Sequence, residues 1–215
     1  MSSRIARTVW VLGDQVNRNL AHLRTARPSQ TRVLFVISLE KLRRAPWHQQ
    51  RLHFILTAMR RLANELTDEG FSVDWRVAET MRQGVSAHLE EFSPEDISVM
   101  QPMNRAGQRL IDSLSETMPI TVTPSDQFLC SREEFAEWAS ANTRKDGSLL
   151  MEDFYRWQRR RLDILIDPDG EPEGGRWNYD DQNRLSPPKG EHKWPAINRR
   201  ELDDVDAWVT DFLAS

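Results

Sequence analysis

The sequence predicts a doubly wound α/β fold of the Rossmann-like type, with a five-stranded parallel sheet and helices on both faces. Two observations lead to this prediction. Short apolar runs that end in turn residues recur up to about residue 125, as expected for strands buried on both faces. Amphipathic helical patterns alternate with these runs, and such alternation is typical of a parallel sheet with right-handed crossovers.

The predicted strands are short and rich in Val, Ile and other apolar residues, and they span residues 8–12, 32–38, 71–77, 97–100 and 120–123. The longest predicted helix covers residues 48–67, because Leu52, Ile55 and Leu56 begin an apolar stripe at three- and four-residue spacing. Gly70 follows as the glycine that commonly ends a helix. Shorter helices are predicted over 81–92 and 105–114.

After about residue 125 the regular alternation stops. Ser131 followed by Glu134 forms a capping-box pattern that starts a helix, and a second helix is predicted over 148–166. Residues 167–195 are rich in Gly and Pro and predict an irregular linker, with an amphipathic stretch over 201–213 behind it. We therefore expect a Rossmann-like domain over residues 1–130 and a helical extension with a linker over 131–215.

Composition narrows the class of protein. The net charge of −4 over 215 residues argues against a broadly basic surface that coats nucleic acid. The single cysteine, Cys130, forms no internal disulfide and fits a reducing compartment. No apolar run approaches the roughly 20 residues that cross a bilayer, so we expect a soluble, cytoplasmic protein.

Polar residues follow the first two predicted strands. Gly13, Asp14 and Gln15 come after the first strand, and Ile37 and Ser38 end the second. Ligands of open parallel sheets bind outside the carboxyl ends of the strands, so these residues predict a binding site. Gly13 would allow a close approach of the backbone, while Asp14 and Gln15 could contact the edge of a heterocycle. The alternative is that Asp14 only caps the following turn.

The sequence names no catalytic residue. His48 lies at the start of the long helix and His53 within it, and each is either a pocket residue or an ordinary surface or packing residue. Metal-binding, phosphate-loop and serine-hydrolase motifs are absent from the sequence, so no metal ligands are predicted. A nucleotide-binding hydrolase on the same fold is disfavoured for the same reason.

Two segments of the extension are chemically distinctive. Arg156, Arg159, Arg160 and Arg161 surround Trp157 and could bind nucleic acid, although nearby carboxylates favour a solvated helix face. Residues 174–180 (GGRWNYD) predict a loop that folds onto a partner surface, or one that is held to its own domain by its aromatic side chains.

An ordered set of motifs points to one family. The motifs are LGDQ at 12–15, HQQRL at 48–52, AMR at 58–60, FLCSREEF at 128–135, MEDFYR at 151–156, GGRWNYD at 174–180 and NR at 183–184. Together they resemble the deoxyribodipyrimidine photolyase-related family, the bacterial iron–sulfur cryptochromes and (6-4) photolyases. The resemblance covers about residues 8–184.

The resemblance implies an antenna domain that holds 6,7-dimethyl-8-ribityllumazine in several members. FAD and an iron–sulfur cluster would lie in a separate C-terminal domain that this sequence does not match, to which the linker would lead. The implied antenna contacts cluster around the first two strands and the long helix, at Gly13, Asp14, Gln15, Val36, Ile37, Ser38, Glu40, His48 and Ile55. Ile37, Lys41 and Arg44 depart from the family, because relatives often carry glutamates and a tyrosine there.

Two functions follow as expectations. In the first, the chain binds an antenna chromophore and supports FAD-dependent, light-driven repair of UV-damaged DNA in an intact protein or with a companion flavin-binding chain. By itself it would catalyse no repair, because the flavin supplies the electron. In the second, it is a stand-alone interaction module with an empty antenna pocket, which docks a partner chain through the Trp177 loop and the terminal helix.

Overall fold

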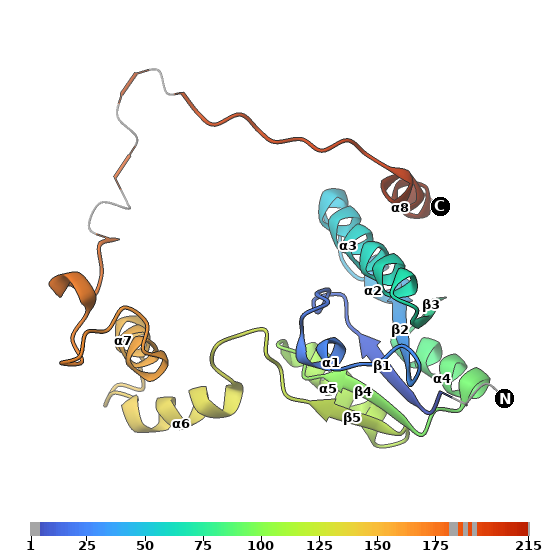
Figure 1. The fold of residues 1–215 in the computed structure, drawn as a ribbon, viewed down its shortest axis with the longest axis horizontal. Coiled ribbons are helices and arrows are strands. Elements are labelled where there is room, and N and C mark those ends of the chain that lie inside the picture. Colours follow the sequence, from blue (N-terminus) through green and yellow to red (C-terminus); the bar gives the residue numbers. More distant parts are fainter. Residues whose placement is uncertain (1–4, 181–184, 187–188, 191–192, 215) are drawn as a thin grey trace. The chain divides into compact units, whose positions relative to one another are not determined.

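A computed structural model describes residues 5–180, 185–186, 189–190 and 193–214. Its first half is built on one sheet of five parallel strands in the order β3-β2-β1-β4-β5 (Figure 1). The strands are β1 (Arg7–Val11), β2 (Thr31–Ser38), β3 (Ser72–Ala78), β4 (Asp96–Met100) and β5 (Ile120–Thr123). This architecture confirms the predicted Rossmann-like α/β fold.

Most helices of the described residues begin and end within a few positions of the predicted ones. The exceptions are two short helices that were not predicted and one helix that is shorter than predicted. The helices are α1 (Ala21–Arg24), α2 (Leu39–Arg43), α3 (Gln49–Asp68), α4 (Met81–Phe92), α5 (Arg105–Ser115), α6 (Arg132–Asn142), α7 (Met151–Leu162), the 3₁₀ turn η1 (Glu173–Gly175) and α8 (Asp204–Ala214). The sequence did not predict α1 and α2, which are too short to show a period. Helix α7 is shorter than the predicted 148–166, because Asp163 adopts a left-handed conformation directly after it.

The sheet separates two hydrophobic cores, and β2 contributes to both. Val33, Phe35 and Ile37 pack in a core with residues of α1, α3 and α8, whereas Leu34 and Val36 pack in a core with α4 and α5. Alternate residues of a strand point to opposite faces, so a strand that is covered on both sides must be apolar throughout. This explains the continuous apolar run that predicted β2.

Local signals set the helix ends where the sequence placed them. Gly70 has φ of +91° and its N–H donates to the Thr67 carbonyl, while Phe71 N–H donates to the Leu66 carbonyl. These two bonds form the Schellman motif that ends α3. The predicted capping box is also confirmed, because Ser131 and Glu134 bond reciprocally at the start of α6.

The described residues group into two compact units. One contains the sheet together with α8, and the other spans residues 129–199 with α6 and α7. The boundary after residue 130 and the 131–215 extension stay predictions; the structure groups residues 200–214 with the sheet. In the part of the chain that the structure describes, no helix is both long and apolar enough to cross a membrane.

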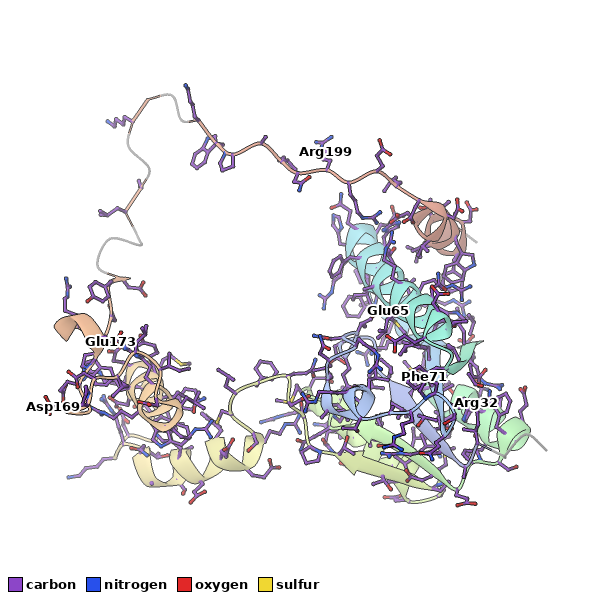
Figure 2. The ribbon with its side chains drawn as sticks, viewed as in Figure 1. Arg32, Glu65, Phe71, Asp169, Glu173 and Arg199 are labelled. Atoms are coloured by element: carbon purple, nitrogen blue, oxygen red, sulfur yellow. The ribbon has the colours of Figure 1, made fainter. Side chains whose placement is uncertain are left out.

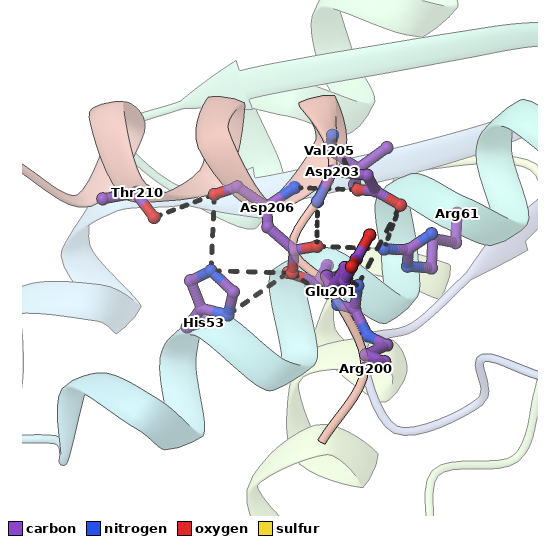
Figure 3. A network of polar contacts seen from close by, with 9 residues as sticks. His53, Arg61, Arg200, Glu201, Asp203, Val205, Asp206 and Thr210 are labelled. Atoms are coloured by element: carbon purple, nitrogen blue, oxygen red, sulfur yellow. Dashed lines mark hydrogen bonds and ion pairs between the residues drawn. The ribbon is translucent and has the colours of Figure 1, made fainter.

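Helix α8 is attached to α3 by a buried carboxylate (Figure 3). The side chain of Asp206 is 1% exposed and forms ion pairs with Arg200 at 2.5 Å and Arg61 at 3.1 Å, while His53 Nε2 lies 3.9 Å from Oδ1. The hydrogen bond from Arg200 holds the pKa of Asp206 well below its ordinary range. Asp206 also accepts from the backbone N–H of Asp203, so it caps α8 as well as docking it.

Aromatic side chains complete this attachment. Trp208 of α8 meets Trp75 of the edge strand β3 edge-on, with ring centroids 5.8 Å apart. The Arg60 guanidinium lies 5.1 Å from the centroid of Trp75 and 5.0 Å from that of Trp208. Val209 next to Trp208 is fully buried in the core. The last helix is therefore part of the first unit's core.

Replacing Asp206 should loosen α8. In Asp206→Asn the two guanidinium groups lose their carboxylate, and we expect the amides of α8 to exchange hydrogen with solvent faster than in the parent protein. Hydrogen exchange followed by mass spectrometry measures this. The control is Asp211→Asn, an exposed position on the same helix; equal protection of α8 in both variants would contradict the assigned role of Asp206.

The buried imidazole of His22 should make stability depend on pH. Both ring nitrogens of His22 are buried without a partner among the described residues, and burial lowers the pKa from 6.5 to about 4 against the opposing effect of Asp126. Between these values the unfolded chain binds more protons than the folded one, so stability falls as pH falls from about 6.5 to about 4. The loss amounts to about 3 kcal/mol, and above pH 6.5 this contribution is fully present.

Urea unfolding at pH 7 and pH 4 tests this dependence in the parent protein and in His22→Leu. In His22→Leu, the free energy of unfolding should differ less between pH 7 and pH 4 than in the parent protein. Gln30→Leu, at an exposed position, should show the same difference as the parent. The same pH difference in His22→Leu as in the parent would show that His22 is not its source.

Candidate functional site

The predicted site residues lie at or after the carboxyl ends of β1 and β2, or in the first turns of α3, and all five strands run in the same direction. Strands β1 and β2 pair in parallel, and Val11 at the end of β1 lies opposite Phe35 of β2. Strand order reverses between β1 and β4, the position at which open α/β sheets bind ligands. Helix α3 begins beyond this edge with His48 as its N-cap. The edge is therefore the candidate functional site.

Gly13 lies against helix α3. A Cβ atom on Gly13 would stand 3.3 Å from Met59 Sδ and 3.5 Å from Ile55 Cγ2. Side chains of α3 thus fill the space that the missing side chain leaves. The glycine allows helix and strand to approach closely, and a ligand at this edge lies outside the Gly13 backbone.

The side chain of Gln15, which follows β1, is hydrogen-bonded to the end of β4. Its side chain is fully buried, and Nε2 donates to the Met100 carbonyl at 2.9 Å and to the Gln101 carbonyl at 3.4 Å. Oε1 is buried and has no hydrogen-bond partner among the described residues. The amide group of Gln15 thus links the turn after β1 to the end of β4, at the point where strand order reverses, and its predicted ligand contact stays a prediction.

Three further residues of the predicted set are also buried. Val36 packs in the core on the α4 side, 2.4 Å from the position of a Cβ atom on Gly84, and Ile37 packs in the core on the α3 side. Ser38 Oγ donates to the Glu79 carbonyl and accepts from Lys41 N–H, so it caps α2. These three residues therefore contribute to packing and to the capping of α2.

The remaining predicted residues stay accessible at the edge. Asp14, Glu40 and His48 are exposed, and Ile55 is half-buried beside Gly13. His48 Nδ1 accepts from Gln50 N–H at 3.2 Å, which orients the ring at the start of α3. The edge therefore offers two carboxylates, an imidazole and an apolar side chain to a ligand.

Sequence reasoning missed several residues that also lie there. Glu79 follows β3, pairs with Arg43 at 3.2 Å, and its carbonyl accepts the N–H of Glu40. Trp47 Nε1 donates to the Lys41 carbonyl, and the Arg51 guanidinium lies 5.2 Å from the Trp47 ring centroid. Their position before α3 and after β3 was a signal that could have identified them.

In the second unit, the arginines of α7 are engaged in local contacts. Arg156 pairs with Glu152 at 3.0 Å and Arg161 with Glu134 at 2.5 Å. The Trp177 ring centroid lies 5.5 Å from the Arg156 guanidinium and 4.4 Å from that of Arg160. The Trp177 loop thus contacts its own unit, which agrees with one of the two predicted alternatives, a loop held to its own domain by its aromatic side chains. Residues 183–184 of the family motif lie outside the described residues.

Groups of three or more metal-ligating side chains do not occur among the residues that the structure describes. The fold defines a Rossmann-like α/β domain, and its sequence has no glycine-rich phosphate loop. The chain belongs to the family described as deoxyribodipyrimidine photo-lyase-related protein, whose model matches residues 9–215. The predicted resemblance is therefore confirmed.

Two curated proteins are similar in sequence to this chain. The (6-4) photolyase of Agrobacterium fabrum is 32% identical over 188 residues, which make up 84% of this chain and 36% of that protein. The chain thus spans about a third of the photolyase. Uncharacterized protein R852 of Acanthamoeba polyphaga mimivirus is 23% identical over 144 residues, or 64% of this chain and 71% of that protein.

Replacing Gln15 should destabilise the junction between the turn after β1 and the end of β4. Gln15→Glu changes a buried donor into a carboxylate that faces two carbonyl oxygens, so we expect a loss of at least about 3 kcal/mol in the free energy of unfolding at pH 7. The loss should shrink at acidic pH as the new carboxyl group is protonated. Urea unfolding measures both effects, with the exposed Gln30→Glu as control; equal stability of the two variants would contradict the burial of Gln15.

Proposed function

We propose that this chain forms the light-collecting part of a photolyase of the (6-4) or cryptochrome type, which repairs UV-damaged DNA with FAD. In this proposal a lumazine-type antenna chromophore binds at the carboxyl edge of the sheet. One observation supports it above the others: the family match begins at residue 9 and so includes the whole edge.

The accessible side chains of the edge fit a chromophore of this kind. The carboxylates of Asp14 and Glu40 can accept hydrogen bonds from the hydroxyl groups of a ribityl chain, and His48 adds a further polar group. The half-buried Ile55 offers an apolar wall to a flat ring. Because Ile55 and Met59 fill the space beside Gly13, the ring would lie on the outer surface of the edge.

The chromophore supplies the absorption of light, and the protein supplies binding and orientation. FAD and an iron–sulfur cluster belong in this proposal to the rest of an intact protein or to a companion chain. A cluster needs about four thiolates, and this sequence has one cysteine. Damaged DNA would be contacted through that flavin-binding part, in the reducing cytoplasm that the lone cysteine favours.

A stand-alone docking module is the second candidate function. The Trp177 loop and the terminal helix, which were expected to bind a partner, make contacts within their own units. The observation that favours docking lies elsewhere, in the apolar side chains that residues 129–199 expose.

Titration with 6,7-dimethyl-8-ribityllumazine tests the proposed function. The ligand's fluorescence should change on binding, and Asp14→Lys should weaken binding about ten-fold or more because it removes a carboxylate acceptor. Glu116→Lys, which makes the same charge change at an exposed position after α5, should bind as the parent does. Absence of any spectral change with the parent protein would refute chromophore binding.

A further inference from the structure

Strand β3 forms one lateral edge of the sheet, and its outer side pairs with no other strand among the described residues. It spans seven residues, whereas β5 at the opposite lateral edge spans four. Arg32 and Phe71, which Figure 2 labels, lie at the start of β3: Arg32 is opposite Ser72 of that strand, and Phe71 directly precedes it. An edge strand presents unpaired N–H and C=O groups, which can bind the strand of another chain.

The sequence of β3 complements itself. A twofold axis normal to the sheet joins two copies of an edge strand as an antiparallel pair and keeps the same face of both sheets on the same side. Directly opposite residues then point to the same face, so the pair must be centred on one residue and its own copy. Centring on Trp75 places Asp74 opposite Arg76 of the second copy. Opposite charges in this position stabilise an antiparallel pair.

The neighbouring registers of the same strand pair are unfavourable. Centring the pair on Asp74 places two carboxylates opposite each other, and centring it on Arg76 places two guanidinium groups opposite each other. Like charges that are directly opposite destabilise a strand pair. Charge therefore selects the register centred on Trp75 over the two registers beside it.

The two charged side chains of β3 are held in place within one chain, and each keeps an atom for a partner. Asp74 Oδ2 accepts from His88 Nδ1 at 2.6 Å and from Arg76 Nε at 2.5 Å. Arg76 Nη2 donates to Glu91 at 2.7 Å. Asp74 Oδ1 and Arg76 Nη1 make no hydrogen bond among the described residues, and both side chains are partly exposed. A second copy would thus meet charged groups that are already oriented, which lowers the entropic cost of association.

The other face of β3 has a groove beside the strand. The groove has a volume of about 400 Å³, and Val73 and Trp75 of β3 line it together with α3 residues that include Ala63 and Thr67. Val77 of the same strand is 45% exposed. The register centred on Trp75 places Val77 of the second copy opposite Val73, where both valines lose contact with water. The apolar side chains therefore favour the same register as the charges.

We propose that β3 is a dimerisation edge, at which two copies of this chain pair antiparallel about Trp75 and form one continuous sheet with five strands from each copy. Asp74 and Arg76 supply complementary charge on one face, and Val73 and Val77 supply the apolar contact on the other. The dimer does not depend on chromophore binding, because Asp14, the residue that the lumazine titration tests, takes no part in the pairing.

Analytical ultracentrifugation of the full chain over a range of concentrations tests the pairing. The parent protein should form a dimer, and Val77→Lys should raise its dissociation constant about ten-fold or more, because the variant places an ammonium group in the contact. Val122→Lys, at a similarly exposed valine on the other edge strand β5, should keep the parent value. A monomeric parent, an unchanged dissociation constant in Val77→Lys, or an equal rise in both variants would overturn the proposal.

Cysteine crosslinking tests the register without an added charge. Cys130→Ser first removes the single native cysteine. Val73→Cys combined with Val77→Cys should then form an intermolecular disulfide under mild oxidation, because these positions are opposite each other across the pair.

The matched control is Val77→Cys alone in the same background. Its two copies lie about 13 Å apart along the paired strands, at roughly 3.3 Å per residue, so it should crosslink far less. Positions 73 and 77 of one chain are separated by a similar distance, so a disulfide in the double variant joins two copies. Equal crosslinking of the two variants, or none in the double variant, would show that β3 does not pair about Trp75.

Discussion

The structure depends on one constraint, which is the burial of both faces of a parallel sheet. Strand β2 meets α3 with Val33 and Phe35 and meets α4 with Val36, so its residues 33–37 form a continuous apolar run. The turn residues Gly13 and Asp14 then follow the end of β1, and the helix cap Ser38 ends β2. Because all strands are parallel, the segments that follow β1, β2 and β3 lie at the same edge, which is where open α/β sheets bind ligands.

Much of that edge serves the fold itself. Gly13 permits the close approach of α3, Gln15 joins β1 to β4, and Ser38 caps α2. What remains for a ligand is an outer layer of Asp14, Glu40 and His48. A substitution at this edge therefore also affects the packing of the sheet, so a binding test there needs a measurement of stability beside it.

The two units are stabilised in different ways. The first has a core on each side of its sheet and fixes α8 with a buried carboxylate (Figure 3). The second has one aromatic cluster around Trp138 and a buried guanidinium, Arg159, that bonds four groups. Arginine provides many directional bonds but little apolar burial. A unit organised in this way keeps its shape and still presents apolar side chains outward.

The sequence by itself determined the fold class, the strands, the long helices, the α6 capping box and the family, because periodicity and capping are local and the motifs occur in order. It also placed Gly13, Asp14 and Gln15 directly after the first strand, at the carboxyl edge of the sheet. Only the tertiary structure decided that Gln15 faces the Met100 carbonyl of β4, that Asp206 pairs with Arg61, and that Arg159 donates to the Leu165 carbonyl. These contacts depend on which elements meet in space, or on a turn in which Leu165 has φ of +53°, and neither leaves a periodic signal in the sequence.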